Sequence, residues 1–147
     1  PIPALAEVQV ALQEAVAEIT KLDGYELKRI MRTGTVATID NRNWELRDQS
    51  GPVQRLSQSR AVALDMESAT IAANGFRFRV PYGTLLSVSD LPLHAVPKLP
   101  AQAQAFYSNS KEAHVMCAVR AVEQLAENPE RLRTRKLRRT LGEVPFR

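Results

Sequence analysis

The stretch RAVALDMESATIAANG, residues 60–75, decides the fold that this sequence predicts. Its first part, Arg60–Leu64, is a short apolar run that is typical of a buried strand. It continues directly into a run of small residues, which predicts a helix over Met66–Asn74 that Gly75 ends. A strand that runs straight into a helix is the repeating unit of α/β folds, so the stretch favours a mixed or parallel sheet.

The residues on the N-terminal side of this stretch extend the same alternation. Ala4–Leu22 predicts a helix, with Pro3 suited to its first turn and Gly24 to its end. Its apolar stripe consists of Leu5, Val8, Leu12, Val16 and Ile19. Tyr25–Asp40 is rich in β-branched residues and predicts one long strand with a bulge or bend at Gly34. The polar segment Asn41–Ser59 predicts a loop with room for a short helix.

The C-terminal side adds one more strand and one more helix. Val80–Ser89 predicts a strand, and a proline-punctuated loop with Pro92, Pro97 and Pro100 follows it. Gln102–Glu127 predicts a long helix that Asn128-Pro129 ends. Its expected buried face consists of Val115, Val119, Val122 and Leu125. Three strands are few for an α/β sheet, so we expect residues outside this chain to supply the other strands.

Composition narrows the class of protein. The chain has 147 residues, 44% of them hydrophobic and 24% charged, which suits one globular domain with a core. No apolar run is long enough to span a membrane. The start, Pro1-Ile2-Pro3-Ala4, has no initiator Met and no signal-peptide pattern, which favours a fragment or a processed piece. One cysteine, Cys117, allows no internal disulfide and predicts a buried helix thiol in a reduced, cytoplasmic protein.

Positive charge gathers in the tail. Residues 131–147 hold seven Arg or Lys and one acid, whereas the first 130 hold 13 basic and 15 acidic residues. We therefore divide the chain into a globular part, 1–130, and a basic tail, 131–147. Taken alone, the tail could bind nucleic acid. The acidic body and the lack of interleaved aromatic residues count against that reading.

Polar side chains follow each predicted strand, where open α/β folds bind their ligands. The first group surrounds Trp44, the second is Asp65-Met66-Glu67-Ser68, and the third is Ser87-Val88-Ser89-Asp90. Carboxylates that accept hydrogen bonds from hydroxyl groups, together with an aromatic ring for a flat base, suit a nucleoside ligand. None of these groups is specific by its spacing alone. His94 and His114 do not suggest a metal site.

Longer motifs carry a family resemblance. LDMESATIAA, followed about 20 residues later by VSD, resembles the nucleoside phosphorylase and nucleosidase superfamily, and RTGTVATID resembles the strand before its base-stacking residue. More narrowly, RTGTVATIDNRNWELR, SRAVALDMESATIAA, GFRFRVPYGTLLSVSDLPLH and the final VPFR resemble the AMP nucleosidase family. The resemblance runs from Ile2 to the last residue. It implies the C-terminal portion of a three-layer α-β-α catalytic domain with a mixed sheet.

The resemblance also implies roles for individual residues. Glu67 would accept hydrogen bonds from the ribose 2′- and 3′-hydroxyls, and Asp65 would assist it. Asp90 would be the catalytic general acid that protonates N7 of the leaving purine, a step typically contributing roughly 10²–10⁴-fold to the rate. Such an acid must hold its proton at neutral pH, and Ser89 is placed to orient it. Further contacts to the sugar or base would come from Met66, Trp44 and Asn43.

Simpler readings compete at several of these positions. Glu67 also suits a helix N-terminus, where the helix dipole favours an acid, and Asp90 suits a turn after a strand. Met66 can be plain core packing, and Trp44 an ordinary half-buried tryptophan.

The family resemblance implies hydrolysis of the N-glycosidic bond of AMP to adenine and ribose 5-phosphate, in purine salvage. No metal or cofactor is implied for the chemistry. MgATP is implied as an allosteric activator that acts through a region outside this chain, and a homo-oligomer, a hexamer, is implied as the assembly. No nucleic-acid or membrane partner is implied. The glycine-rich phosphate loop of the family is absent here, so we expect little activity from this chain alone.

Two further readings remain open. A phosphate-dependent purine nucleoside phosphorylase would use the same fold, and a noncatalytic assembly subunit would need only to keep it. Intact Asp65, Glu67 and Asp90 argue against the second of these.

Overall fold

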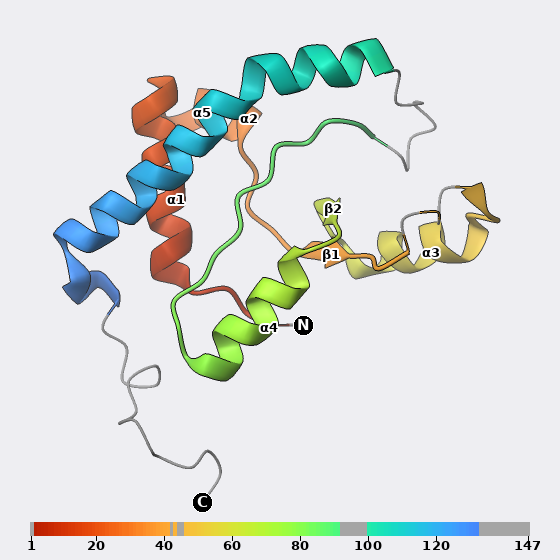
Figure 1. Ribbon diagram of the computed structural model, residues 1–147, viewed down its shortest axis with the longest axis horizontal. Helices are drawn as coiled ribbons and strands as arrows, with labels where there is room; N and C mark the ends of the chain where they lie inside the picture. Colours follow the sequence, from red (N-terminus) through yellow and green to blue (C-terminus); the bar gives the residue numbers. More distant parts are fainter. Residues whose placement is uncertain (1, 42, 44–45, 92–99, 133–147) are drawn as a thin grey trace, which may run out of the picture.

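The computed structural model describes residues 2–41, 43, 46–91 and 100–132 (Figure 1). These residues form helices, two short strands and one long extended segment at residues 80–89. The elements, in chain order, are α1 (Ala6–Thr20), α2 (Gly24–Ile30), β1 (Val36–Thr38), α3 (Ser50–Ser59), β2 (Ala63–Asp65), α4 (Ser68–Phe78), α5 (Pro100–Glu127) and the 3₁₀ turn η3 (Pro129–Leu132). Helices thus alternate with strands, as the α/β prediction requires.

The two strands pair in parallel. Val36 faces Ala63, and Thr38 faces Asp65, so β1 and β2 end side by side. Two flanking backbone bonds extend the ladder, from the Val62 N–H to the Thr35 carbonyl (2.8 Å) and from the Ile39 N–H to the Asp65 carbonyl (2.9 Å). Parallel strands need a crossover connection, and here that connection contains α3. The predicted short helix within 41–59 and the strand before α4 are therefore both confirmed.

The core lies between α1 and α5, which cross one another (Figure 1). Ala11 and Ala15 of α1 are fully buried, and Ala121 of α5 is 2% exposed. Alanines at the contact let two helix backbones approach closely, and larger side chains on either side then fill the layer. These side chains are Val8, Leu12, Val16, Leu27, Cys117 and Leu125. The predicted α1 stripe and the buried thiol of Cys117 are both confirmed.

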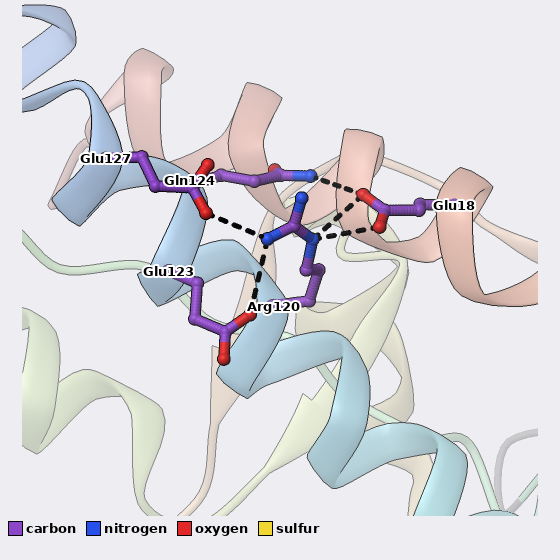
Figure 2. A network of polar contacts seen from close by, with 5 residues as sticks. All are labelled: Glu18, Arg120, Glu123, Gln124 and Glu127. Carbon is purple, nitrogen blue, oxygen red and sulfur yellow. Dashed lines mark hydrogen bonds and ion pairs between the residues drawn. The ribbon is translucent and has the colours of Figure 1, made fainter.

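Polar contacts also join the exposed sides of these two helices. Figure 2 shows Arg120 of α5 between Glu18 of α1 and two carboxylates of its own helix. The Arg120 Nε lies 2.9 Å and 3.0 Å from the two Glu18 carboxylate oxygens. This hydrogen bond holds the pKa of Glu18 below its ordinary value, although partial desolvation opposes the shift. Exposed ion pairs add little stability, so the network orients the helices more than it holds them together.

Two predicted elements are wrong in kind. Residues 24–30 are a helix and not the start of a long strand, because Glu26, Lys28 and Arg29 favour helix and Glu26 pairs with Arg29 one turn away at 3.2 Å. The expected bend at Gly34 is confirmed. Residues 80–89 run as an extended trace outside the sheet (Figure 1). A strand is defined by its ladder partner, and none of the described residues offers one to this segment.

Two predicted details of the helices are also wrong. α4 continues through Gly75 and ends at Phe78, and its C-cap residue Arg79 takes the left-handed conformation with φ 58°. Gly75 serves packing instead, because a Cβ there would lie 2.3 Å from the Tyr82 ring. On α5, three residues of the expected buried face are exposed, namely Val115 (60%), Val119 (51%) and Val122 (66%). The face through Cys117, Ala121 and Leu125 is buried because it matches the alanines of α1.

Overpacking the α1–α5 contact should destabilise the protein. Replacing fully buried Ala15 by leucine forces additional side-chain carbons into a filled layer, and we expect a loss of about 1–3 kcal/mol in the free energy of unfolding. Gln13→Leu places the same side chain on the exposed face of α1, where the effect should stay within about 0.5 kcal/mol. Urea unfolding followed by circular dichroism measures both. Equal effects of the two variants would contradict this account of the core.

Candidate active site at the strand ends

The candidate site begins where β2 passes into α4. Asp65 is the last residue of β2, and Thr38, the last residue of β1, is its ladder partner. Because the strands are parallel, both side chains stand at the carboxyl edge of the sheet, where α/β proteins bind ligands. The structure thus places the Asp65-Met66-Glu67-Ser68 group at the edge that the sequence predicts.

A hydrogen-bonded cluster fixes this junction, and we call it the Thr38–Asp65–Ser68 clamp. The Thr38 hydroxyl donates to Asp65 Oδ1 at 2.7 Å, and the Ser68 hydroxyl donates to the same oxygen at 2.8 Å. The Ser68 backbone N–H donates to Asp65 Oδ2 at 2.7 Å. The Thr38 oxygen in turn accepts the Ala69 N–H at 3.0 Å. Each hydroxyl has one proton and both point to Asp65, so the 3.0 Å separation of the Thr38 and Ser68 oxygens follows from their shared acceptor.

The clamp determines the charge state of Asp65. Burial by itself would raise the pKa of this carboxyl. The hydrogen bonds from Thr38 and Ser68, with backbone donors at Ser68 and Glu67, outweigh burial and hold the pKa below its ordinary value of 3.8. Asp65 is therefore an ionised acceptor whose lone pairs serve the fold. Its predicted assistance to a ribose stays a prediction, and its observed contacts position the start of α4.

Glu67 lies at the first turn of α4, and its carboxylate makes no hydrogen bond or ion pair with the described residues. It is the N-cap residue of the helix, and its carbonyl accepts the N–H groups of Thr70 (3.0 Å) and Ile71 (3.3 Å). Its side chain makes no capping hydrogen bond and is exposed. Met66 beside it is 41% exposed, so it does not belong to the core that the described residues form. The clamp therefore holds the backbone on both sides of Glu67 and leaves the Glu67 carboxylate available to a ligand.

Ser89 and Asp90 form a second group, on the extended segment after α4. The Ser89 hydroxyl donates to Asp90 Oδ1, and both residues are half-buried. The segment is attached to the core at Leu85, which packs against the buried side chains between α1 and α5, and at Ser87, whose hydroxyl contacts His114 Nδ1 of α5.

The third predicted group is only partly described. Trp44 lies outside the described residues. Asn43 is exposed, and its backbone N–H donates to Asn41 Oδ1 at 3.1 Å, which forms a tight turn after β1. Its predicted contact with a base stays a prediction.

Sequence reasoning missed Thr38. The signal was available in the spacing, because an Asp followed three residues later by Ser at a helix start is a capping pattern. The carboxylate of an aspartate that ends a strand needs a further hydrogen-bond donor. The threonine that ends the neighbouring strand is the natural candidate for this donor.

The described residues contain neither a metal-binding cluster nor a membrane-spanning helix. Within residues 2–41, 43, 46–91 and 100–132, no three His, Cys, Asp or Glu side chains gather closely enough to hold a metal ion. None of the helices in that part of the chain has both the length and the apolar character to cross a membrane.

Comparison with known proteins defines the class first. The family model described as the phosphorylase superfamily matches residues 1–126, and the chain therefore belongs to that superfamily. Its α/β fold class is thereby confirmed. The chain is also 55% identical over all of its 147 residues to the AMP nucleosidase of Escherichia coli strain K12, and equally so to that of strain O157:H7. It spans 30% of the length of each of these relatives.

The ionised state of Asp65 should appear in the pH dependence of stability. A carboxyl whose folded pKa is lowered contributes stability above its unfolded pKa, near 3.8, and loses that contribution as the pH falls through the folded value. We therefore expect Asp65→Asn to destabilise the protein at pH 7. The difference between variant and wild type in the free energy of unfolding should narrow below pH 4. Urea unfolding at pH 7 and at pH 3 measures it.

The matched control for this measurement is Asp23→Asn, an exposed aspartate that makes no side-chain cap bond. This variant should change stability little at pH 7. A difference for Asp65→Asn that stays constant from pH 7 to pH 3 would contradict the assigned role of the clamp.

Proposed function

We propose that this chain supplies the ribose- and purine-facing part of an active site that hydrolyses AMP to adenine and ribose 5-phosphate. One observation carries the proposal. The exposed carboxylate of Glu67 lies beside the strand end that the clamp fixes, in a chain that is 55% identical to the AMP nucleosidase of Escherichia coli strain K12. Membership in the phosphorylase superfamily supports chemistry at an N-glycosidic bond.

The chemistry divides between the two polar groups. Glu67 would accept hydrogen bonds from both ribose hydroxyls, which an ionised carboxylate does well because it is only an acceptor. As the bond from C1′ to N9 breaks, its electron pair moves onto the purine, and Asp90 would protonate N7 to neutralise that charge. A water molecule would add to C1′ of the oxocarbenium-like sugar and release a proton. Ser89 would keep the Asp90 carboxyl directed at the base.

Other parts of the site would come from residues that are not described or not present here. Trp44 would stack on adenine, with Asn43 beside it. We expect the ligands of the 5′-phosphate to lie elsewhere in the protein, since the chain spans 30% of its relatives. A cytoplasmic homo-oligomer, a role in purine salvage and activation by MgATP through another region are further parts of this proposal.

The closest alternative is a phosphate-dependent purine nucleoside phosphorylase, which belongs to the same superfamily. The two activities differ in whether water or phosphate attacks C1′. An adenine-release assay on the complete protein separates them. We expect release from AMP without added phosphate, and much slower release from adenosine. A strict requirement for phosphate would replace hydrolysis by phosphorolysis.

Nucleic-acid binding by the basic tail is the alternative from another class. Residues 133–147 lie outside the described part, so only a binding measurement addresses it. Affinity for DNA that falls steeply with salt would favour a nucleic-acid-binding module.

The role of Asp90 predicts a specific loss. Asp90→Asn in the complete protein keeps the size of the side chain but cannot deliver the proton. We expect kcat for AMP to fall by roughly 10²–10⁴-fold, with a small change in KM. Steady-state kinetics measures both constants, and Asp23→Asn controls for the loss of one carboxylate. Near wild-type turnover in Asp90→Asn would remove Asp90 from the mechanism.

A further inference from the structure

Thr38 has no place in the proposed chemistry, yet its hydroxyl connects three parts of the site. It belongs to β1, donates to Asp65 at the end of β2, and accepts the Ala69 N–H in the first turn of α4. The bonds from Ser68 to Asp65 are local, since the two residues are three positions apart in the chain. The two Thr38 bonds join residues that are 27 and 31 positions apart. Thr38 is therefore the long-range link of the clamp.

We propose that Thr38 is a positioning residue that sets the Glu67 carboxylate for the ribose hydroxyls of the substrate. This inference rests on the proposed function of Glu67. Glu67 lies between Asp65 and Ala69, the two residues that Thr38 holds. Because both neighbouring segments are fixed, the backbone of Glu67 has little freedom, and the direction of its Cα–Cβ bond is set before substrate binds.

The hydroxyl and the branched carbon of Thr38 contribute differently. The hydroxyl supplies one donor to Asp65 and satisfies one of the helix N–H groups that have no partner within the helix. Without it, Asp65 loses a donor and Ala69 N–H loses its acceptor. The branched carbon restricts rotation of the side chain on a strand. We therefore expect serine to preserve most of the function and valine, which has nearly the same shape, to lose it.

A loss of general stability must be separated from a loss of positioning. Glu67 acts on the ribose hydroxyls, so its correct placement favours AMP over 2′-deoxy-AMP. A variant that only loosens the fold lowers kcat/KM for both substrates in proportion. A variant that displaces Glu67 lowers kcat/KM for AMP more, and the ratio of the two constants falls. That ratio is the readout for a positioning role.

The experiment measures this ratio for the complete protein and its variants, each checked for folding by thermal melting. Glu67→Gln sets the lower limit of the ratio. Thr38→Val should lower the ratio roughly tenfold, toward that limit, which corresponds to about one hydrogen bond between substrate and protein. Thr38→Ser should stay within about twofold of wild type, because the donor and acceptor remain. Thr35→Val, which removes an exposed hydroxyl from the same segment, should leave the ratio unchanged.

The outcomes separate this inference from the proposed function. An unchanged ratio in Thr38→Val, with a collapsed ratio in Glu67→Gln, would overturn the positioning role alone. No adenine release from AMP by wild type, or an unchanged ratio in Glu67→Gln, would overturn both. If Thr38→Val does not fold, Thr38→Ala decides, because it removes the same hydroxyl and with it both long-range bonds. An unchanged ratio in Thr38→Ala would then overturn the inference.

Discussion

The hydrogen bonds that Asp65 accepts at the end of β2 are the constraint on which the rest of the site depends. A half-buried carboxylate loses part of its hydration, which is costly unless donors compensate it, and here Thr38 and Ser68 supply them from two different elements. That requirement joins β1, β2 and α4 at one point, although the strands have only three residues each. The chain thus obtains a fixed strand end from side-chain bonds where the ladder is too short to provide one.

The packed helices α1 and α5 fix a second part of the site. Its alanine contact brings the helices close, and the extended segment after α4 is attached to it at Gly83, Leu85 and Ser87. A Cβ at Gly83 would lie 2.5 Å from Val8, so the segment can lie against α1 only with glycine there. Ser89 and Asp90 follow these attachments directly. One group of proposed site residues is therefore held by the strand ends and the other by the helical core.

The sequence predicts the parts of this molecule that local patterns determine. The α1 stripe and the step from β2 to α4 follow from apolar spacing, and the motif around Glu67 follows from resemblance. Predictions from local patterns were wrong where a residue far away in the sequence determines the structure. Residues 80–89 read as a strand, but strand formation needs a neighbour. Val115 and Val119 have the same spacing as a buried face, but the alanines of α1 select the face through Ala121. Thr38 looked like any strand threonine, because its role appears only when Asp65 lies opposite.

We propose that Glu67, held in place by the clamp, binds the ribose of AMP while Asp65 keeps its hydrogen bonds to Thr38 and Ser68. The most direct measurement is a crystal structure of the complete Asp90→Asn protein with AMP bound. We expect Glu67 carboxylate oxygens within about 3.2 Å of both ribose hydroxyls. We also expect that Asp65 still accepts the hydrogen bonds of Thr38 and Ser68. A ribose held by other residues, or an Asp65 that leaves Thr38 to bind the sugar, would contradict this proposal.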